Sequence, residues 1–424
     1  MWQNLTMKAA TTNINVVINS TVATCPACGL LCDDILVDNN QQQIKVLVNG
    51  CAKATHFFEQ PLNTAIPQIN GKPANMHQAI SRVKKLLNAS QQPLFAGLST
   101  DVQGFRSLLN LAQKTNASFQ HINAASMARN MKVLQSSGWQ TTTLTEVKNR
   151  ADVIVCIGTD VVSHNPRFFE RIVWPKDAMF VDSQMREVIY IGENLDTKAG
   201  TSPNGTPPFL LACRAADLPE ITLVLRALVA DKKLKIVQIA GIKISDLQAV
   251  ADKLKAAKYA VLAWVTKDCD FPHAELTIQN ITETVAILNN TTRAAGLPLG
   301  GSDGDTSVNN ANTWLSGLAL NDEVIEHDLM IWVNSFSAHI NPSKTDNPLI
   351  VIGSSNCEFS QTPDVFIPVA TPGLDCSGTL FRVDSSVALP LKKVRKNSLP
   401  ALSQVISQIE AALLGGNLMN DHLA

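Results

Sequence analysis

The chain of 424 residues has little charge and few aromatic side chains. Only 17% of its residues are Asp, Glu, Lys or Arg, below the quarter or so that is usual for a globular protein. Lys and Arg total 35 against 36 Asp and Glu, so the formal net charge is −1. No field of one sign exists to attract nucleic acid or an acidic membrane surface. A thinly charged surface is typical of chains that bury area against permanent partner subunits.

Long hydrophobic runs are also missing. The most apolar runs, 259–265 and 329–333, are far shorter than the roughly 20 residues that cross a bilayer, and we predict both as buried strands. Residues 1–24 lack the apolar segment and small-residue cleavage site of a secretory signal. An odd total of nine cysteines argues against a secreted disulfide framework. We therefore expect a cytoplasmic protein.

Familiar catalytic motifs are absent as well. The chain contains no G-x-S-x-G, H-E-x-x-H or phosphate-binding-loop pattern, and its eight histidines stand apart from one another. For His164, at the mouth of a predicted strand, we favour a structural role over a catalytic one. Asp33 and Asp34 follow a cysteine directly, and we expect them to cap or hydrogen-bond a neighbouring hairpin.

What the chain does contain is a regular alternation of helical and strand patterns. Buried strands that alternate with helices indicate an α/β architecture with a mostly parallel sheet. The predicted strands are 93–98, 151–158, 179–181, 259–265, 329–333 and 349–353. Two hairpins are also predicted, 35–37 with 44–48 and 379–383 with 387–391. The final amphipathic helix has Ser398 as its expected cap.

Four of the nine cysteines lie between residues 25 and 51. Cys25, Cys28 and Cys32 form a C-x2-C-x3-C pattern, and Cys51 follows the returning strand of the first hairpin. Such short spacings let one loop surround a metal, and both tetrahedral zinc and a [4Fe–4S] cluster accept four thiolates. The spacing does not choose between them, although it makes unliganded thiols or disulfides the lesser expectation.

The segment 24–35, TCPACGLLCDDI, resembles the N-terminal motif of the B subunit of formylmethanofuran dehydrogenase, a branch of the molybdopterin oxidoreductases. Two further matches follow in order. Residues 146–167 look like that family's central strand and the loop after it, and 364–382, DVFIPVATPGLDCSGTLFR, look like its C-terminal signature.

The resemblance implies a molybdopterin-oxidoreductase-like α/β fold, in which a small cysteine-centred β domain accompanies two Rossmann-like lobes. The expected divisions are 1–65 for the four-cysteine domain, 66–126 with 290–375 for the first lobe, 127–289 for the second, and 376–424 for a hairpin and helix that return to the N-terminal part.

In that family four cysteines hold a [4Fe–4S] cluster, which takes electrons from a tungsten or molybdenum centre bound by two pterin dinucleotides. The resemblance therefore implies that Cys25, Cys28, Cys32 and Cys51 are the metal ligands. It also implies that Lys53 is the basic residue between cluster and pterin.

Three family positions are lost in this chain. Ala128 stands where the dehydrogenases carry the Cys or selenocysteine that binds the metal, and Arg129 replaces the histidine beside it. Alanine has no lone pair to offer a metal, and a guanidinium does not exchange protons near neutrality. Gly300 replaces the arginine that faces the substrate carboxylate. We therefore expect no catalytic residue and no molybdenum or tungsten pterin in this chain.

The same losses resemble the B subunit of the formyltransferase/hydrolase complex of aerobic methylotrophic bacteria. That resemblance implies a non-redox scaffold in a complex that converts formyl-tetrahydromethanopterin to formate through formyl-methanofuran or formyl-methylofuran. The partners would be a zinc hydrolase subunit, a formyltransferase subunit and a third subunit, with no nucleic acid or membrane. Two alternatives stay open: a working molybdenum or tungsten dehydrogenase subunit, and a zinc-stabilised structural protein.

Overall fold

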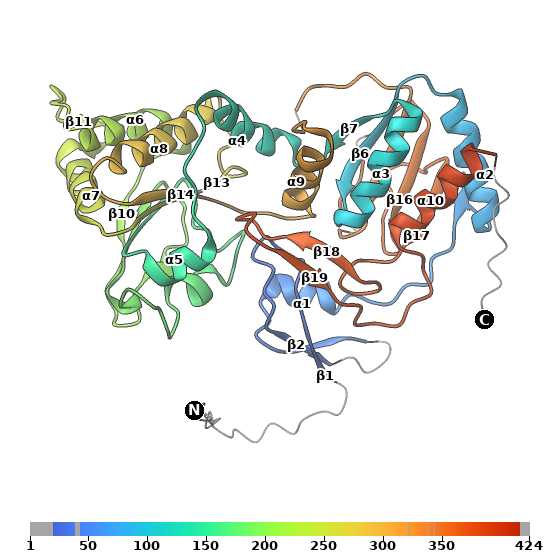
Figure 1. The fold of residues 1–424 in the computed structure, drawn as a ribbon, viewed down its shortest axis with the longest axis horizontal. Coiled ribbons are helices and arrows are strands. Elements are labelled where there is room, and N and C mark those ends of the chain that lie inside the picture. Colours follow the sequence, from blue (N-terminus) through green and yellow to red (C-terminus); the bar gives the residue numbers. More distant parts are fainter. Residues whose placement is uncertain (1–19, 39–42, 321, 338, 343, 416–424) are drawn as a thin grey trace, which may run out of the picture.

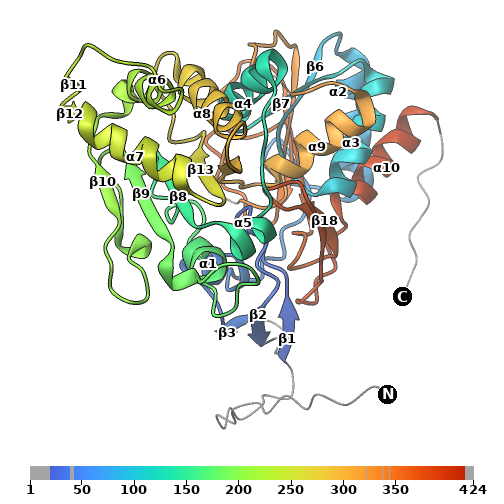
Figure 2. The same ribbon diagram turned by 60° about the vertical axis from the view of Figure 1, so that its left-hand side comes forward.

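The computed structural model describes residues 20–38, 43–320, 322–337, 339–342 and 344–415. Two separate sheets built mainly of parallel strands form its two sides, and a small antiparallel sheet and a hairpin lie between and below them (Figures 1 and 2). No helix in the described ranges is long and apolar enough to cross a membrane. Most of the N-terminal stretch that we searched for a signal sequence lies outside these ranges.

The first sheet has seven strands. Its order is β5 (Lys72–Pro73), β4 (Gln68–Ile69), β17 (Val365–Val369), β16 (Leu349–Ser354), β15 (Leu329–Asn334), β6 (Pro93–Ser99) and β7 (Ser118–His121). The five strands from β17 to β7 are parallel, and the β4–β5 hairpin joins one edge antiparallel. Its apolar core includes residues of α2 (Met76–Ala89), α3 (Val102–Thr115), α9 (Asp305–Ser316) and α10 (Leu402–Leu413).

The second sheet has five parallel strands. Its order is β10 (Phe209–Leu211), β9 (Glu187–Ile191), β8 (Val153–Ile157), β13 (Ala260–Val265) and β14 (Ala294–Leu299). Helices α6 (Leu218–Val229), α7 (Ile244–Ala256) and α8 (Ala274–Leu288) cover one face. Helices α4 (Ala124–Ser137) and α5 (Leu144–Arg150) connect β7 of the first sheet to β8 of the second.

Successive side chains of the second sheet point to opposite faces, as the period of a strand requires. Val155 and Leu262 pack in the core with α6, α7 and α8. Cys156, Tyr190 and Ala263 pack instead in the core that contains the cysteines near the N-terminus. The cysteine-bearing loop thus helps to bury the second face of this sheet.

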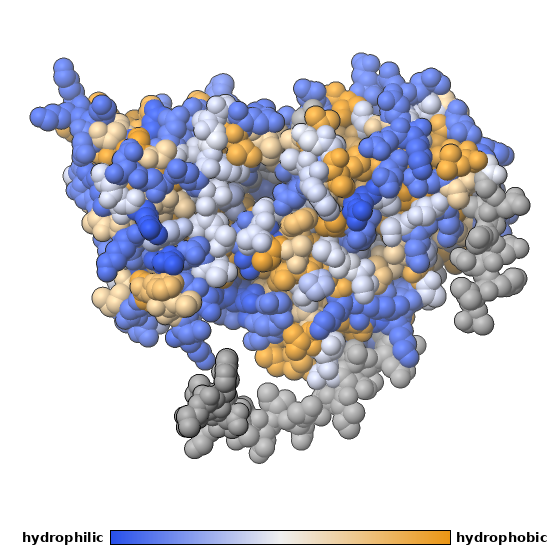
Figure 3. Space-filling model, viewed as in Figure 1, coloured by the Kyte–Doolittle hydropathy of each residue, from blue (hydrophilic) through white to orange (hydrophobic). Residues whose placement is uncertain are grey.

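The small sheet consists of β1 (Ser20–Ala23), β2 (Ile35–Asp38) and β3 (Lys45–Val48), and it is followed by α1 (Ala52–Phe58). Strands β18 (Gly378–Phe381) and β19 (Ala388–Leu391) form a hairpin near the C-terminus. Both predicted hairpins are therefore confirmed over the described residues. The small sheet leaves Val22, Leu47 and Val48 exposed, and Figure 3 shows apolar side chains at the lower end of the molecule, where Figure 1 places this sheet.

Two local predictions are wrong. Residues 179–181 form no strand: Met179 and Phe180 are exposed, and the Phe180 ring lies 4.1 Å from the Arg150 guanidinium. A short apolar run between turns carries too little information to distinguish a strand from a loop. The last helix begins after Ala401 rather than near Ser398, and the Gln404 side chain accepts a hydrogen bond from the Ala401 amide.

One expected division also needs correction. We expected residues 290–375 to belong with the first lobe, but β14 at 294–299 pairs with β13 in the second sheet. The chain therefore crosses to the first sheet only after Leu299. In the C-terminal part, α10 packs against α2 and α3 of the first sheet, whereas the amide of Val383, just after β18, bonds the cysteine-bearing loop.

Candidate cluster site

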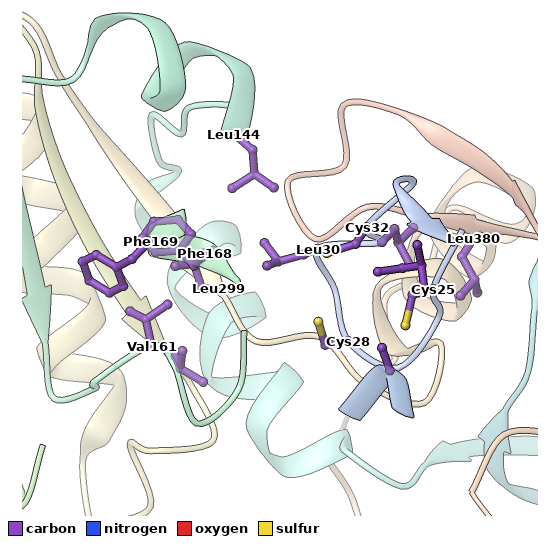
Figure 4. Packing of buried hydrophobic residues seen from close by; sticks show 14 of the residues in the cluster. Cys25, Cys28, Leu30, Cys32, Leu144, Val161, Phe168, Phe169, Leu299 and Leu380 are labelled. Carbon is purple, nitrogen blue, oxygen red and sulfur yellow. The ribbon is translucent and has the colours of Figure 1, made fainter. Parts of the chain in front are cut away.

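Three of the four predicted ligands lie on one loop, which we call the cysteine loop (residues 24–34). Cys25, Cys28 and Cys32 are buried there, and the Cys25 amide donates to the Cys32 carbonyl over 2.8 Å. Cys51 forms the N-cap of α1 after the returning strand β3. Figure 4 shows Cys25, Cys28 and Cys32 together on this loop, from which Leu30 reaches toward Phe168 and Leu144. The fold thus gathers all four cysteines around one apolar core.

The thiols of the cysteine loop lie where their charged form is disfavoured. Burial is the largest cause that raises the pKa of Cys25 well above its ordinary value, and the three other cysteines add to it. Burial also raises the pKa of Cys28, and that of Cys32 to about 11. Without a bound cation these thiols therefore stay protonated and neutral near neutral pH.

The backbone near two of the thiols partly offsets burial. The Ala27 backbone lowers the pKa of the Cys25 thiol, and the Leu30 backbone lowers that of the Cys28 thiol, in both cases against the larger effect of burial.

Over the described ranges, no three His, Cys, Asp or Glu side chains converge closely enough to hold a metal ion. The arrangement of the four cysteines therefore does not choose between tetrahedral zinc and a [4Fe–4S] cluster, both of which accept four thiolates.

Gly29 holds the cysteine loop against a second glycine-rich loop, 300–305. Its amide donates to Gly301 O over 2.8 Å, and its carbonyl accepts from the Val383 amide over 2.9 Å. A Cβ atom on Gly29 would lie 2.6 Å from Gly300 O and 2.7 Å from the Val383 Cβ. Only glycine fits this contact without displacing a neighbour.

Lys53 lies close enough to the predicted ligand Cys28 for its charge to act on that thiol. Its charge lowers the pKa of Cys28, against the larger effect of burial. Its Nζ donates to the His164 carbonyl over 2.9 Å. The His164 ring is 2.7 Å from the Asp268 carboxylate, so backbone and ring of this histidine both serve contacts between loops.

Asp34 bonds the hairpin only through its carbonyl, which accepts from Asn49 Nδ2 over 2.9 Å, and the carboxylates of Asp33 and Asp34 pair with arginines instead. Asp34 forms a bidentate ion pair with Arg167, and Asp33 pairs with Arg171 over 2.7 Å. Both arginines follow β8, more than a hundred residues along the chain, so no local pattern could reveal these pairs. They fasten the cysteine loop to the second sheet.

The three positions at which we expected the family's catalytic residues to be lost make structural contacts. Ala128 is buried in α4 at 4% exposure. Arg129 donates to the Thr266 carbonyl over 3.1 Å and pairs with Asp270. Gly300 exchanges two hydrogen bonds with the side chain of Asn165. None of these groups is left available for proton transfer or metal binding.

Two cavities are lined in part by loop 300–305. One, of about 300 Å³, is lined by α4, by Gly300 and by Lys267, whose Nζ donates to Ser302 Oγ over 2.6 Å. The other, of about 1120 Å³, is lined by Lys53 and Asp303 among others. Lys267 is a cation that sequence patterns did not reveal, because it lies 35 positions from the glycine loop it contacts.

His121 ends β7 next to the same loop and is almost completely buried. Its Nδ1 accepts a hydrogen bond from the Asn123 amide over 2.9 Å, and its Nε2 has no hydrogen-bond partner among the described residues. Burial is the main cause that lowers its pKa to about 4. The ring is therefore neutral near neutral pH.

Together these features define a mixed α/β protein in which two sheets of mainly parallel strands flank the cysteine loop and Cys51. No family model matches the chain. It is 26% identical over 416 residues to the B subunit of the tungsten-containing formylmethanofuran dehydrogenase 2 of Methanococcus maripaludis, a match that covers 88% of this chain and 93% of that relative. The protein of the same name from Methanocaldococcus jannaschii is 25% identical over 412 residues, with 87% and 92% covered.

A shorter match is 33% identical over 90 residues to the B subunit of the formyltransferase/hydrolase complex Fhc of Methylorubrum extorquens, covering 21% of this chain and 25% of that relative. The fold also matches a chain in the crystal structure of the FhcABCD complex from that organism, with a TM-score of 0.66 and 21% identity over 82% of this chain and 99% of the other. The chain thus has homologues among the B subunits of both enzyme systems, as its three motifs predicted.

Proposed function

We propose that this chain is the non-redox B-type scaffold subunit of a cytoplasmic formyltransferase/hydrolase complex. Such a complex converts formyl-tetrahydromethanopterin to formate through formyl-methanofuran or formyl-methylofuran. The expected partners are a zinc hydrolase subunit, a formyltransferase subunit and a third subunit. The small cysteine-centred domain and the two α/β lobes would form the platform on which they assemble.

The observation that carries this proposal is Ala128. A tungsten or molybdenum centre of the dehydrogenase type takes one ligand from the protein at this position, and a methyl group cannot supply it. The neighbouring Arg129 is held by Thr266 and Asp270, and no guanidinium replaces a histidine as a proton shuttle. The residues present therefore do not fit a working pterin-bound metal.

The four cysteines fit a [4Fe–4S] cluster, which supplies one-electron transfer in redox proteins. Cys25, Cys28, Cys32 and Cys51 would be its ligands, with Lys53 beside it. In a subunit without a metal–pterin centre, we infer that such a cluster is structural. The loop that holds it is bonded to loops 164–171 and 300–305 and to the C-terminal hairpin.

One observation favours a second candidate, a working dehydrogenase subunit. The match to tungsten-containing relatives extends over 88% of this chain, whereas the sequence match to the Fhc subunit spans only 90 residues. Under this alternative the metal would be bound by the pterins without a protein thiolate.

A single purification separates the two. The chain is tagged in its native host, the complex is isolated without oxygen, and tungsten, molybdenum and iron are measured by mass spectrometry alongside the co-purifying subunits. The scaffold proposal expects a hydrolase and a formyltransferase with no stoichiometric tungsten or molybdenum. One tungsten or molybdenum per chain, with formate-dependent dye reduction, would establish the dehydrogenase instead.

A further inference from the structure

The connection between α6 and α7, which we call the lysine segment (residues 231–243), carries a local excess of positive charge. It contains the two short strands β11 (Gln238–Ile239) and β12 (Ile242–Lys243), which form a hairpin. Its four exposed lysines are Lys232, Lys233, Lys235 and Lys243. Among the residues that the structure describes, none of the four forms an ion pair, because the one acidic residue of the segment, Asp231, pairs with Lys255 of α7 over 2.9 Å.

The lysine segment is anchored to the core of the second sheet, so its outer side chains are presented from a fixed base. Leu234 and Ile244 pack against that core, and Ile242 is buried in it. The Ile244 amide donates to Val237 O over 3.0 Å, which joins the start of α7 to the hairpin. Ile236 and Val237 nevertheless remain 45% and 82% exposed. Two branched apolar side chains thus lie in water among the lysines.

The lysine segment is open to a partner. Figure 1 places β11 at the outer end of the lobe built on the second sheet, away from the small sheet and from α10. Figure 3 shows hydrophilic side chains projecting at the same corner. The segment is therefore separate from the cysteine loop, and what it binds does not depend on whether the chain holds a metal.

We propose that the lysine segment is a docking surface for another protein, whose contact face carries Asp and Glu around an apolar centre. The chain as a whole has a formal net charge of −1, so it has no general attraction for an acidic partner, and the attraction comes from this local set of lysines. Complementary charges orient such an encounter. Removal of Ile236 and Val237 from water on contact then contributes to the affinity.

The composition of the lysine segment favours a protein over nucleic acid or lipid. The segment has no arginine, whose planar guanidinium binds phosphate through two hydrogen bonds. It also has no aromatic ring on which a base could stack or that could anchor at lipid headgroups. Ile and Val suit the dehydrated centre of a protein contact, and lysine suits its solvated rim.

The first test identifies the partner's carboxylates directly. The protein is isolated from its host at low salt and treated with a carbodiimide, which takes up the water lost when a lysine amine and a touching carboxylate condense to an amide. Mass spectrometry of the linked peptides then names both residues. We expect links from the lysine segment to Asp or Glu of one partner protein. The absence of links to another protein would overturn the proposal.

The second test measures affinity for the purified linked partner by calorimetry. Lys233→Glu with Lys235→Glu reverses two charges of the segment, and Lys72→Glu with Lys85→Glu is the matched control on exposed lysines of the first lobe. Both variants should keep the wild-type thermal transition, because the substituted side chains are exposed. We expect the first variant to bind about tenfold more weakly than wild type at low salt, and the difference to shrink as salt rises.

The control variant should bind the partner as wild type does. Wild-type affinity in Lys233→Glu with Lys235→Glu would contradict the docking surface. Duplex DNA or phosphatidylserine vesicles that bind the wild-type chain and lose it through these two substitutions, with no protein link formed, would assign the surface to nucleic acid or membrane and overturn the proposal.

Discussion

Asp34 and Arg167 form a two-pronged ion pair, in which Nη1 lies 2.7 Å from Oδ1 and Nη2 lies 2.9 Å from Oδ2. The two residues are 133 positions apart. Arg167 is 5% exposed and also bonds Glu170. This fork-to-fork geometry is the strongest form of a charged hydrogen bond, and it anchors the cysteine loop beside the second sheet.

The first prediction concerns Asp34→Asn. Burial raises the pKa of Asp34, but the hydrogen bond from Arg167 and the charges of Arg171 and Arg167 outweigh it, so the pKa is lowered. A carboxyl group with a lowered folded pKa stabilises the protein above its unfolded value of about 3.9 and loses that effect as pH falls through the folded value. Asp34→Asn should cost about 1 kcal/mol at pH 7, after allowance for its partial exposure.

Urea unfolding at pH 7 and at pH 3 measures this effect, and the difference between variant and wild type should shrink at the lower pH. Asp177→Asn is the control, because Asp177 is highly exposed and its contact with Lys148 spans 3.6 Å. An equal loss at both pH values would contradict the assignment.

The second prediction concerns Gly29→Ala. The new methyl group would collide with Gly300 O and with Val383, so the cysteine loop must move away from loop 300–305. Forced overpacking of this kind costs about 1–3 kcal/mol. We expect the Gly29→Ala variant to have a lower metal content and a lower thermal transition temperature.

Gly205→Ala is the control for Gly29→Ala, because a Cβ atom at Gly205 would meet nothing within 4 Å. Only the backbone conformation at this position should then cost stability, and the metal content should stay unchanged. Full metal content in Gly29→Ala would refute the close contact.

The third prediction concerns the pH dependence that His121 introduces. Because its folded pKa is about 4 and an unfolded histidine titrates near 6.5, the unfolded state binds a proton first as pH falls. Stability should therefore decrease from pH 6.5 toward pH 4, by up to about 1.4 kcal/mol per pH unit. His121→Asn removes this titration and should flatten the slope in urea unfolding, whereas His77→Gln on the surface should not. An unchanged slope in His121→Asn would mean that the pKa of the ring is the same in the folded and unfolded protein.

The fourth prediction concerns the buried pair of Arg395 and Asp375, which are 2% exposed each. Arg395 Nε lies 2.8 Å from the Asp375 carboxylate, and Nη1 donates to Gln60 O over 2.8 Å. Arg395→Met leaves a buried carboxylate without its partner and should cost about 3–5 kcal/mol. Asp375→Asn combined with Arg395→Met should recover part of that loss in a double-mutant cycle. If the losses of the two single variants simply add, the residues do not interact.

Some of the candidate site followed directly from short stretches of sequence. The spacing of Cys25, Cys28 and Cys32 predicted that all three lie on one loop, because cysteines only a few positions apart belong to the same short segment. The first hairpin predicted that Cys51 would return to it, and the structure brings it into the same core. Ala128 was informative because its methyl side chain has no lone pair with which to bind a metal, whatever its surroundings.

Other parts of the fold were beyond reach of local patterns. The run 179–181 was mistaken for a strand, since three apolar residues fit either a strand or a loop that packs on an arginine. The position of β14 in the second sheet depends on its pairing with β13. The sequence of a strand alone does not specify which strand it will pair with.

The sequence by itself determined the α/β class and the cysteine loop, because each depends on residues a few positions apart. Only the tertiary structure decided what surrounds that loop. Asn165 against Gly300, Arg167 against Asp34 and Gly29 against Gly301 join segments more than a hundred residues apart. Such contacts form when two sheets and a loop exclude water together, and no periodicity along the chain records them.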